Sequence, residues 1–278
     1  YATALNMGYS PFSLATDRRL SVKVPGFKEY SPKNYDDEYI GATTLVHALS
    51  NSINTIAVEL GNSIGYDRIR STAREFGITS NISLNPSMSL GTSEVSLIEL
   101  TGVYTGFLNK GIKVEPFGLR QLFLKGDDFP LINQKQILGS RVISVGAAET
   151  LIFMLHQVID SGTGARARVP DWGLAGKTGT TQNARDAWFL GFSSEYVVGV
   201  WIGKDNNEPL NGVTGGTLPA EIWKNIMLAL KPFHREPLSI TIPSPPVSSK
   251  TIPFDRNVRN MPGEGILGKI FQSFIGQP

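Results

Sequence analysis

Apolar residues in the first 160 positions recur mainly at the three- and four-residue spacing of amphipathic helices. Glycines and small polar residues interrupt this spacing where helices are expected to start and stop, as Ser96 and Glu99 do in a capping box. Thr43 or Thr44 is expected to cap the first of these helices. The pattern predicts five helices, which cover residues 45–49, 54–60, 66–76, 97–108 and 142–159.

The pattern changes after residue 172, where short β-branched and aromatic runs alternate with polar turns. The runs at 173–180, 188–192 and 196–202 predict three consecutive strands of an antiparallel sheet, and a helix near Pro219 follows them. Because helices and strands are segregated along the chain, we predict an α+β fold in which helices flank an antiparallel β-sheet. The apolar face of the sheet is expected to consist of Trp188, Phe189, Phe192 and Trp201.

The composition is that of a globular protein with little scope for metal or thiol chemistry. Lys and Arg number 26 against 24 Asp and Glu, and no dense basic run is present, which argues against a nucleic-acid partner. The absence of cysteine excludes a thiol nucleophile, and three isolated histidines do not form a zinc motif. Eight of the 17 prolines follow residue 231, so we predict a domain over 1–230 and a Pro-rich tail over 231–278.

Lys177-Thr178-Gly179 is the first candidate for a chemical site. With the preceding Gly176, the run Gly-Lys-Thr also resembles the end of a phosphate-binding loop. Asp171 stands where that motif requires glycine, and strand-like sequence follows where the motif requires a helix, so this interpretation is rejected. The remaining alternative is a strand lysine that faces solvent.

Ser52-Ile53-Asn54 is the second candidate. A Ser-x-Asn run arises about once by chance in a chain of this length, and Ser83-Leu84-Asn85 repeats it. Ser52 lies between two predicted helices, where its hydroxyl can project into a cleft, whereas Ser83 lies in a polar loop. A plain helix cap is the alternative role for Ser52.

Together the two motifs resemble those of the penicillin-recognising serine enzymes, and longer runs resemble class A penicillin-binding proteins. The resemblance holds in order over about residues 1–230 and rests on Asn34-Tyr35-Asp36, 41–58, Ser89-Leu90-Gly91, Asn109-Lys110-Gly111, Ser161-Gly162-Thr163-Gly164, 176–181, 186–189, Gly191-Phe192, 200–203 and Gly215-Gly216. The third family motif, Ser-x-x-Lys, occurs nowhere in the chain. In the family that motif lies just upstream of a helix similar to 1–7, so we expect an N-terminally truncated chain that is not acylated by itself.

The resemblance implies the penicillin-recognising serine enzyme fold, shared by β-lactamases and transpeptidases. It further implies a D,D-transpeptidase that cross-links peptidoglycan stem peptides through an acyl-serine intermediate and is inhibited by β-lactams. The catalytic residues implied are Ser52, Asn54 and Lys177. The substrate-binding residues implied are Thr178, Gly179 and Thr180.

The resemblance also implies partners and a location. The expected ligands are stem peptides that end in D-Ala-D-Ala and β-lactams, with no metal or other cofactor. A bifunctional parent, with an upstream glycosyltransferase domain and membrane anchor, would act on the periplasmic face of the bacterial cytoplasmic membrane beside other cell-wall synthesis proteins. Two alternatives stay open, namely a non-catalytic penicillin-binding or sensor relative, and a β-lactamase or D,D-carboxypeptidase of the same fold.

Overall fold

The computed structural model describes residues 1–23, 29–233 and 236–244, which form seven α-helices and nine short strands. The first half of the chain contains α1 (Ala2–Asn6), β1 (Leu14–Asp17), β2 (Gly41–Thr44), α2 (Leu45–Ser50), α3 (Asn54–Ile64), α4 (Tyr66–Phe76), the 3-10 helix η1 (Pro86–Leu90) and α5 (Leu97–Leu108). The second half contains β3 (Ile112–Val114), β4 (Gln121–Leu122), β5 (Ile132–Asn133), β6 (Leu138–Arg141), α6 (Val145–Asp160), η2 (Ala165–Ala167), β7 (Ala175–Thr180), η3 (Gln182–Ala184), β8 (Asp186–Phe192), β9 (Val197–Gly203), α7 (Leu218–Leu230) and η4 (Lys231–Phe233).

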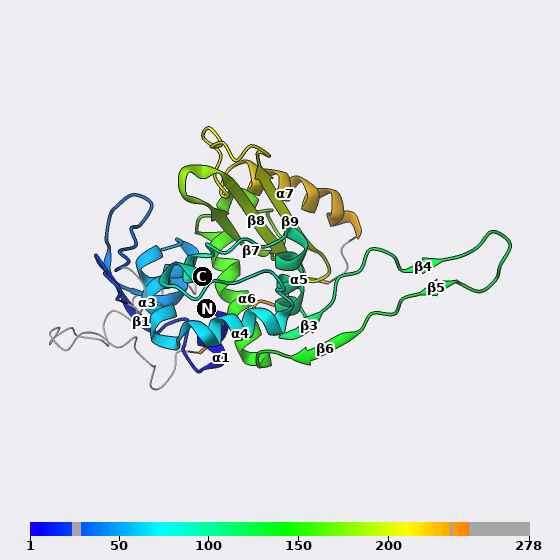
Figure 1. Ribbon diagram of the computed structural model, residues 1–278, viewed down its shortest axis with the longest axis horizontal. Helices are drawn as coiled ribbons and strands as arrows, with labels where there is room; N and C mark the ends of the chain where they lie inside the picture. Colours follow the sequence, from blue (N-terminus) through cyan, green and yellow to red (C-terminus); the bar gives the residue numbers. More distant parts are fainter. Residues whose placement is uncertain (24–28, 234–235, 245–278) are drawn as a thin grey trace.

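Helix α6 lies between helices α1 and α2 and strand β7 of the sheet (Figure 1). Ten of its 16 residues are buried, because the helix is apolar on nearly all of its circumference. It contacts α1, α2 and α5 on the helical side and β7 on the sheet side. The end of α6 therefore leads the chain from the helical layer to the first strand of the sheet.

Strands β7, β8 and β9 form an antiparallel sheet in that order, as predicted. Helix α7 covers one face, where Trp223 packs on Phe189 with ring centroids 5.0 Å apart, while α5 and α6 cover the other face. The prediction of a single apolar face was wrong: Phe189 and Phe192 are three residues apart and belong to opposite faces, and Trp201 is 43% exposed. The α+β class is confirmed, and within the described strands one edge of β7 is unpaired.

The predicted helices are present, with one informative difference. Helix α3 continues through Gly61 to Ile64, although Gly61 was expected to end it. A Cβ at Gly61 would lie 1.9 Å from the side-chain oxygen of Ser89 on η1, so this glycine permits close packing between helices. The Ser96–Glu99 capping box and the left-handed Gly77 after α4 are both as predicted.

Residues 112–141 form a long two-stranded arm that projects from the body (Figure 1). Antiparallel pairs β3–β6 and β4–β5 make up this arm. Most of the predicted Pro-rich tail lies outside the described residues, but Leu238 in its described part is buried in the main core. Of the helices in the described ranges, none combines the length and apolar character of a membrane span.

Candidate active site

Lys177 and Ser52 lie 125 residues apart in the sequence and meet where β7 adjoins the turn between α2 and α3. The Lys177 ammonium donates hydrogen bonds to Ser52 Oγ and to the Thr178 carbonyl oxygen, the latter over 2.9 Å. Lys177 is half-buried, which excludes the alternative of a strand lysine that faces solvent. The two motifs singled out in the sequence thus form one polar site.

Burial lowers the pKa of Lys177 from its ordinary value of 10.5 to about 8. Near pH 7 about nine in ten side chains with this pKa still carry a proton. The site is therefore positively charged at neutral pH. Since the ammonium donates to Ser52 Oγ, that oxygen acts as an acceptor, and the proton of the Ser52 hydroxyl remains free to donate.

Ser52 adopts a backbone conformation that favours glycine. Its φ is 55°, and its N–H donates to the Leu49 carbonyl over 3.2 Å just after α2 ends. Glycine or asparagine usually occupies such a left-handed position, so a serine here indicates that its side chain is needed. Ser52 is not the cap of α3, because Ile53 is the N-cap residue, which removes the alternative considered for the sequence.

Asn54 begins α3 and faces a different neighbour. Its side-chain amide donates to the Lys33 carbonyl over 2.8 Å, and its backbone N–H donates to Asn34 Oδ1 over 3.1 Å. The hydrogen bonds of Asn54 thus connect the Ser-x-Asn turn to the loop before β2. Of the three predicted catalytic residues, the structure brings Ser52 and Lys177 into direct contact. Asn54 lies two residues after Ser52, at the first position of α3.

Strand β7 continues the site beyond Lys177 with two hydroxyl groups. Thr178 Oγ1 lies 2.8 Å from Thr163 Oγ1, and exposed Thr180 accepts a hydrogen bond of 3.0 Å from the Gly215 N–H through Oγ1. This leaves the Thr180 hydroxyl proton free for a carboxylate. Gly215 packs on the backbone of Gly179, since a Cβ at Gly215 would lie 2.5 Å from the Gly179 carbonyl oxygen. The unpaired edge of β7 retains backbone groups for an extended ligand.

Thr163 is a residue to which the sequence analysis assigned no role. It lies in the loop after α6, donates its N–H to the Ser50 carbonyl over 3.0 Å and contacts Thr178 through its hydroxyl. Thr163 therefore connects the end of α2, which precedes Ser52, with strand β7. The only sequence signal was its position within a run that resembles the family.

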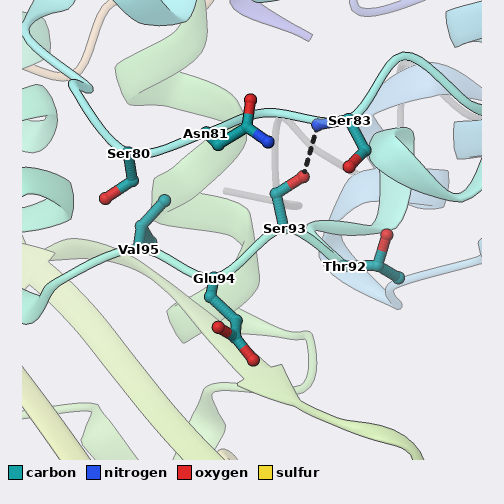
Figure 2. Close-up of a pocket in the computed structure, with 7 residues that line it drawn as sticks. All are labelled: Ser80, Asn81, Ser83, Thr92, Ser93, Glu94 and Val95. Atoms are coloured by element: carbon teal, nitrogen blue, oxygen red, sulfur yellow. Dashed lines mark hydrogen bonds between the residues drawn. The ribbon is translucent and has the colours of Figure 1, made fainter.

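The second Ser-x-Asn run lies in a different environment, as expected. The Ser83 N–H donates to Ser93 Oγ over 3.1 Å at a polar pocket of about 590 Å³, which Figure 2 shows. Asn85 caps η1 by accepting from the Met88 N–H. The residues that line this pocket are Ser80, Asn81, Ser83, Thr92, Ser93, Glu94 and Val95, and none belongs to the Ser52–Lys177 site.

A family model of the penicillin binding protein transpeptidase domain matches residues 2–228. The chain belongs to this family. Penicillin-binding protein 1A of Aquifex aeolicus is 35% identical over 201 residues, which are 72% of this chain and 27% of that protein. The chain thus spans about a quarter of the length of this curated relative.

Solved structures of penicillin-binding proteins have the same fold as this chain. The crystal structure of penicillin-binding protein 1A from Haemophilus influenzae matches with a TM-score of 0.77 at 24% identity, over 86% of this chain and 42% of that one. PonA1 of Mycobacterium tuberculosis in complex with penicillin V matches with a TM-score of 0.75 at 21% identity, over 91% and 72%. The predicted penicillin-recognising serine enzyme fold is confirmed.

Proposed function

We propose that the protein containing this chain is a serine D,D-transpeptidase that cross-links peptidoglycan stem peptides and is acylated by β-lactams. The contact between the Lys177 ammonium and Ser52 Oγ carries the proposal, because it joins the two family motifs into one proton-handling site. Membership of the transpeptidase family supports it. The complex of PonA1 with penicillin V supports β-lactam binding by the same fold.

The proposed reaction proceeds in two acyl transfers. A serine oxygen attacks the carbonyl carbon between the two D-Ala residues, the C–N bond breaks, and D-Ala leaves with a proton that Ser52 passes to its amine. An amine of a neighbouring stem peptide then attacks the acyl carbon, the ester C–O bond breaks, and the serine oxygen takes up the proton that the amine loses. The free proton on the Ser52 hydroxyl and the cation beside it suit this relay.

The remaining site residues would bind the substrate. Thr178 and Thr180 present hydroxyls toward the terminal carboxylate, and Lys177 supplies the positive charge that attracts it. The Thr180 N–H would form an oxyanion hole with the N–H of the nucleophile, and such a donor contributes roughly 3–4 kcal/mol in other enzymes. Gly179 would let the substrate lie along β7, and Asn54 would bind the acyl amide.

We propose that the nucleophile lies outside these 278 residues, since Ser-x-x-Lys does not occur among them. We propose that it precedes Tyr1, that residues 1–230 form the transpeptidase domain and 231–278 its tail, and that the lysine of the absent motif is the general base. We also propose the glycosyltransferase domain, membrane anchor, periplasmic location and cell-wall synthesis partners of a bifunctional parent.

A fluorescent penicillin tests this function. The protein that joins this chain to a Ser-x-x-Lys segment should bind the label covalently, one per chain, and the 278 residues alone should stay unlabelled. An assay that mixes a D-Ala-D-Ala stem peptide with an acceptor amine should then release D-Ala and yield the cross-linked product. Labelling of the 278 residues alone would show that another serine is the nucleophile, and label without cross-linking would favour the sensor relative.

A further inference from the structure

Helix α3 lacks a side-chain cap of its own. Its N-cap residue is Ile53, whose side chain has no hydrogen-bonding atom and is 8% exposed in the core. The first amides of a helix have no partner within the helix and need an acceptor from elsewhere. Here the N–H groups of Asn54 and Thr55 donate to Asn34 Oδ1 over 3.1 and 3.4 Å. A residue 20 positions upstream therefore acts as the cap.

The orientation of the Asn34 amide is fixed by Asp17. Asn34 Nδ2 lies 2.8 and 3.0 Å from the two carboxylate oxygens of Asp17, and it also donates to the Glu38 carbonyl over 2.8 Å. A carboxylate only accepts hydrogen bonds, so it selects the amide orientation that points the nitrogen toward Asp17. The Asn34 oxygen is thereby directed at the start of α3.

Asp17 is itself held firmly in place. It is 2% exposed and lies at the end of β1, which pairs with β2. Its carboxylate accepts from Thr55 Oγ1 over 2.5 Å and from the Ile40 N–H over 3.0 Å. The negative charge also lies at the N-terminus of α3, which favours anions. The β1–β2 pair therefore fixes the position of the Asp17 carboxylate relative to the N-terminus of α3.

We propose that Asn34, oriented by Asp17, is a positioning residue for the acyl-transfer site. Ser52 precedes α3 by two residues in a strained left-handed conformation. Because the cap comes from Asn34, the Ser52 hydroxyl is not used as a cap and stays available for Lys177. This inference rests on the proposed function and adds residues to which the sequence analysis gave no role.

Asn34→Ala tests the inference in the protein that carries the Ser-x-x-Lys segment. The second-order rate of acylation by benzylpenicillin should fall by about 10²-fold, because misplacement of a catalytic group by about 1 Å has effects of that size. The fall should reside in the first-order acylation constant. The dissociation constant of the non-covalent complex should stay within about threefold, since the β7 hydroxyls are untouched.

Ser144→Ala is the control for the loss of a helix cap. Ser144 caps α6 by accepting from the Ala147 N–H over 3.2 Å, at the helix end away from Thr163. Loss of the Ser144 cap should lower Tm by about 2–4 °C, and Asn34→Ala should lower it further, because Asp17 and the Glu38 carbonyl also lose a donor. Only Asn34→Ala should slow acylation, so a general loss of stability is separated from a loss of positioning.

Donor and acceptor exchange gives a test that does not remove side-chain volume. Asp17→Asn places an amide against the Asn34 amide, favours its rotation and should slow acylation by about 10- to 100-fold. Asp17→Asn combined with Asn34→Asp restores one donor and one acceptor. The double variant should therefore be acylated at least fivefold faster than Asp17→Asn. Recovery should be incomplete, because the Glu38 carbonyl loses its donor.

The outcomes separate this inference from the proposed function. If the unsubstituted protein is not acylated, the proposed function is wrong and the inference falls with it. If it is acylated and Asn34→Ala reacts within threefold of its rate, the inference alone is overturned. An exchange variant no faster than Asp17→Asn while equally folded would likewise contradict the oriented-amide argument.

Discussion

Lys177→Met should make the folded chain more stable at neutral pH, although Lys177 is central to the proposed chemistry. Burial lowers the pKa of Lys177 to about 8, which means that the fold disfavours the charged form. Methionine fills a similar volume without a charge and adapts to irregular surroundings. The substitution therefore removes a half-buried cation that the fold tolerates at a cost in stability.

The magnitude follows from the pKa. The difference between 10.5 and about 8 corresponds to about 3 kcal/mol, at 1.36 kcal/mol for each pKa unit. The variant also loses the hydrogen bonds to Ser52 Oγ and to the Thr178 carbonyl, which are each worth about 1 kcal/mol. We expect a net gain of about 1 kcal/mol in the free energy of unfolding at pH 7, or roughly 2–4 °C in Tm.

The gain should depend on pH in a defined direction. Between pH 8 and 10.5 the unfolded lysine keeps its proton while the folded one loses it, so the stability of the unsubstituted chain rises with pH there. The advantage of Lys177→Met is therefore complete below pH 8 and disappears as the pH approaches 10.5. Above that pH the variant should be less stable than the unsubstituted chain, because it lacks the hydrogen bonds to Ser52 Oγ and the Thr178 carbonyl.

Urea unfolding of both proteins at several pH values from 7 to 10.5 measures this difference. Other titrating groups are common to both proteins, so they cancel when the free energies of unfolding are subtracted. Lys135→Met on the exposed arm is the control and should change stability by less than ~0.5 kcal/mol throughout. A Lys177→Met difference that stays constant across this range would refute the reasoning.

Three further substitutions test separate parts of the structure. Thr163→Val removes the hydroxyl beside Thr178, and stopped-flow acylation should be about tenfold slower while Tm changes by less than ~2 °C. Gly215→Ala places a Cβ 2.4 Å from the Trp188 carbonyl oxygen and should lower the free energy of unfolding by about 1–3 kcal/mol. The control Gly146→Ala meets nothing within 4 Å and should not lower it. Equal effects of the two substitutions in denaturant titrations would contradict the close packing at Gly215. Glu99→Gln should destabilise α5 at neutral pH, because hydrogen bonds from Thr79, Ser80 and Ser96 lower the pKa of Glu99. Folded Glu99 then stays ionised at pH values where the unfolded residue binds a proton, so the difference in Tm should shrink as the pH falls below about 4.5 and would not shrink if these bonds were absent.

Local patterns predicted the helices and the three-stranded sheet well, because helix caps and strand runs depend on residues close in sequence. The capping box of α5 and the Gly77 stop of α4 are examples. Patterns failed where a distant segment decides the outcome. Gly61 continues α3 because η1 packs against it, and the sheet is apolar on both faces because α7 covers the face that holds Phe189.

The residues of the candidate site likewise include some that local motifs predicted and others that depend on distant partners. Ser52 and Lys177 could be selected from the sequence, because each belongs to a short motif whose residue types suit acyl transfer. Thr163, Asn34 and Asp17 could not be given roles, because their partners lie many residues away and leave no local spacing to recognise. Their contribution follows only from the hydrogen bonds of the folded chain.

The rate at which Ser52→Ala is acylated by benzylpenicillin, in the protein that carries the Ser-x-x-Lys segment, tests the central claim most directly. Ser83→Ala is the control, since Ser83 belongs to the same tripeptide pattern but lies at the polar pocket. We expect Ser52→Ala to slow acylation by ~10²–10⁴-fold with little change in Tm, the usual contribution of a positioned acid–base group. Ser83→Ala should react at the unsubstituted rate. Equal rates for both variants and the unsubstituted protein would contradict the assignment of Ser52 and Lys177 as one acyl-transfer site.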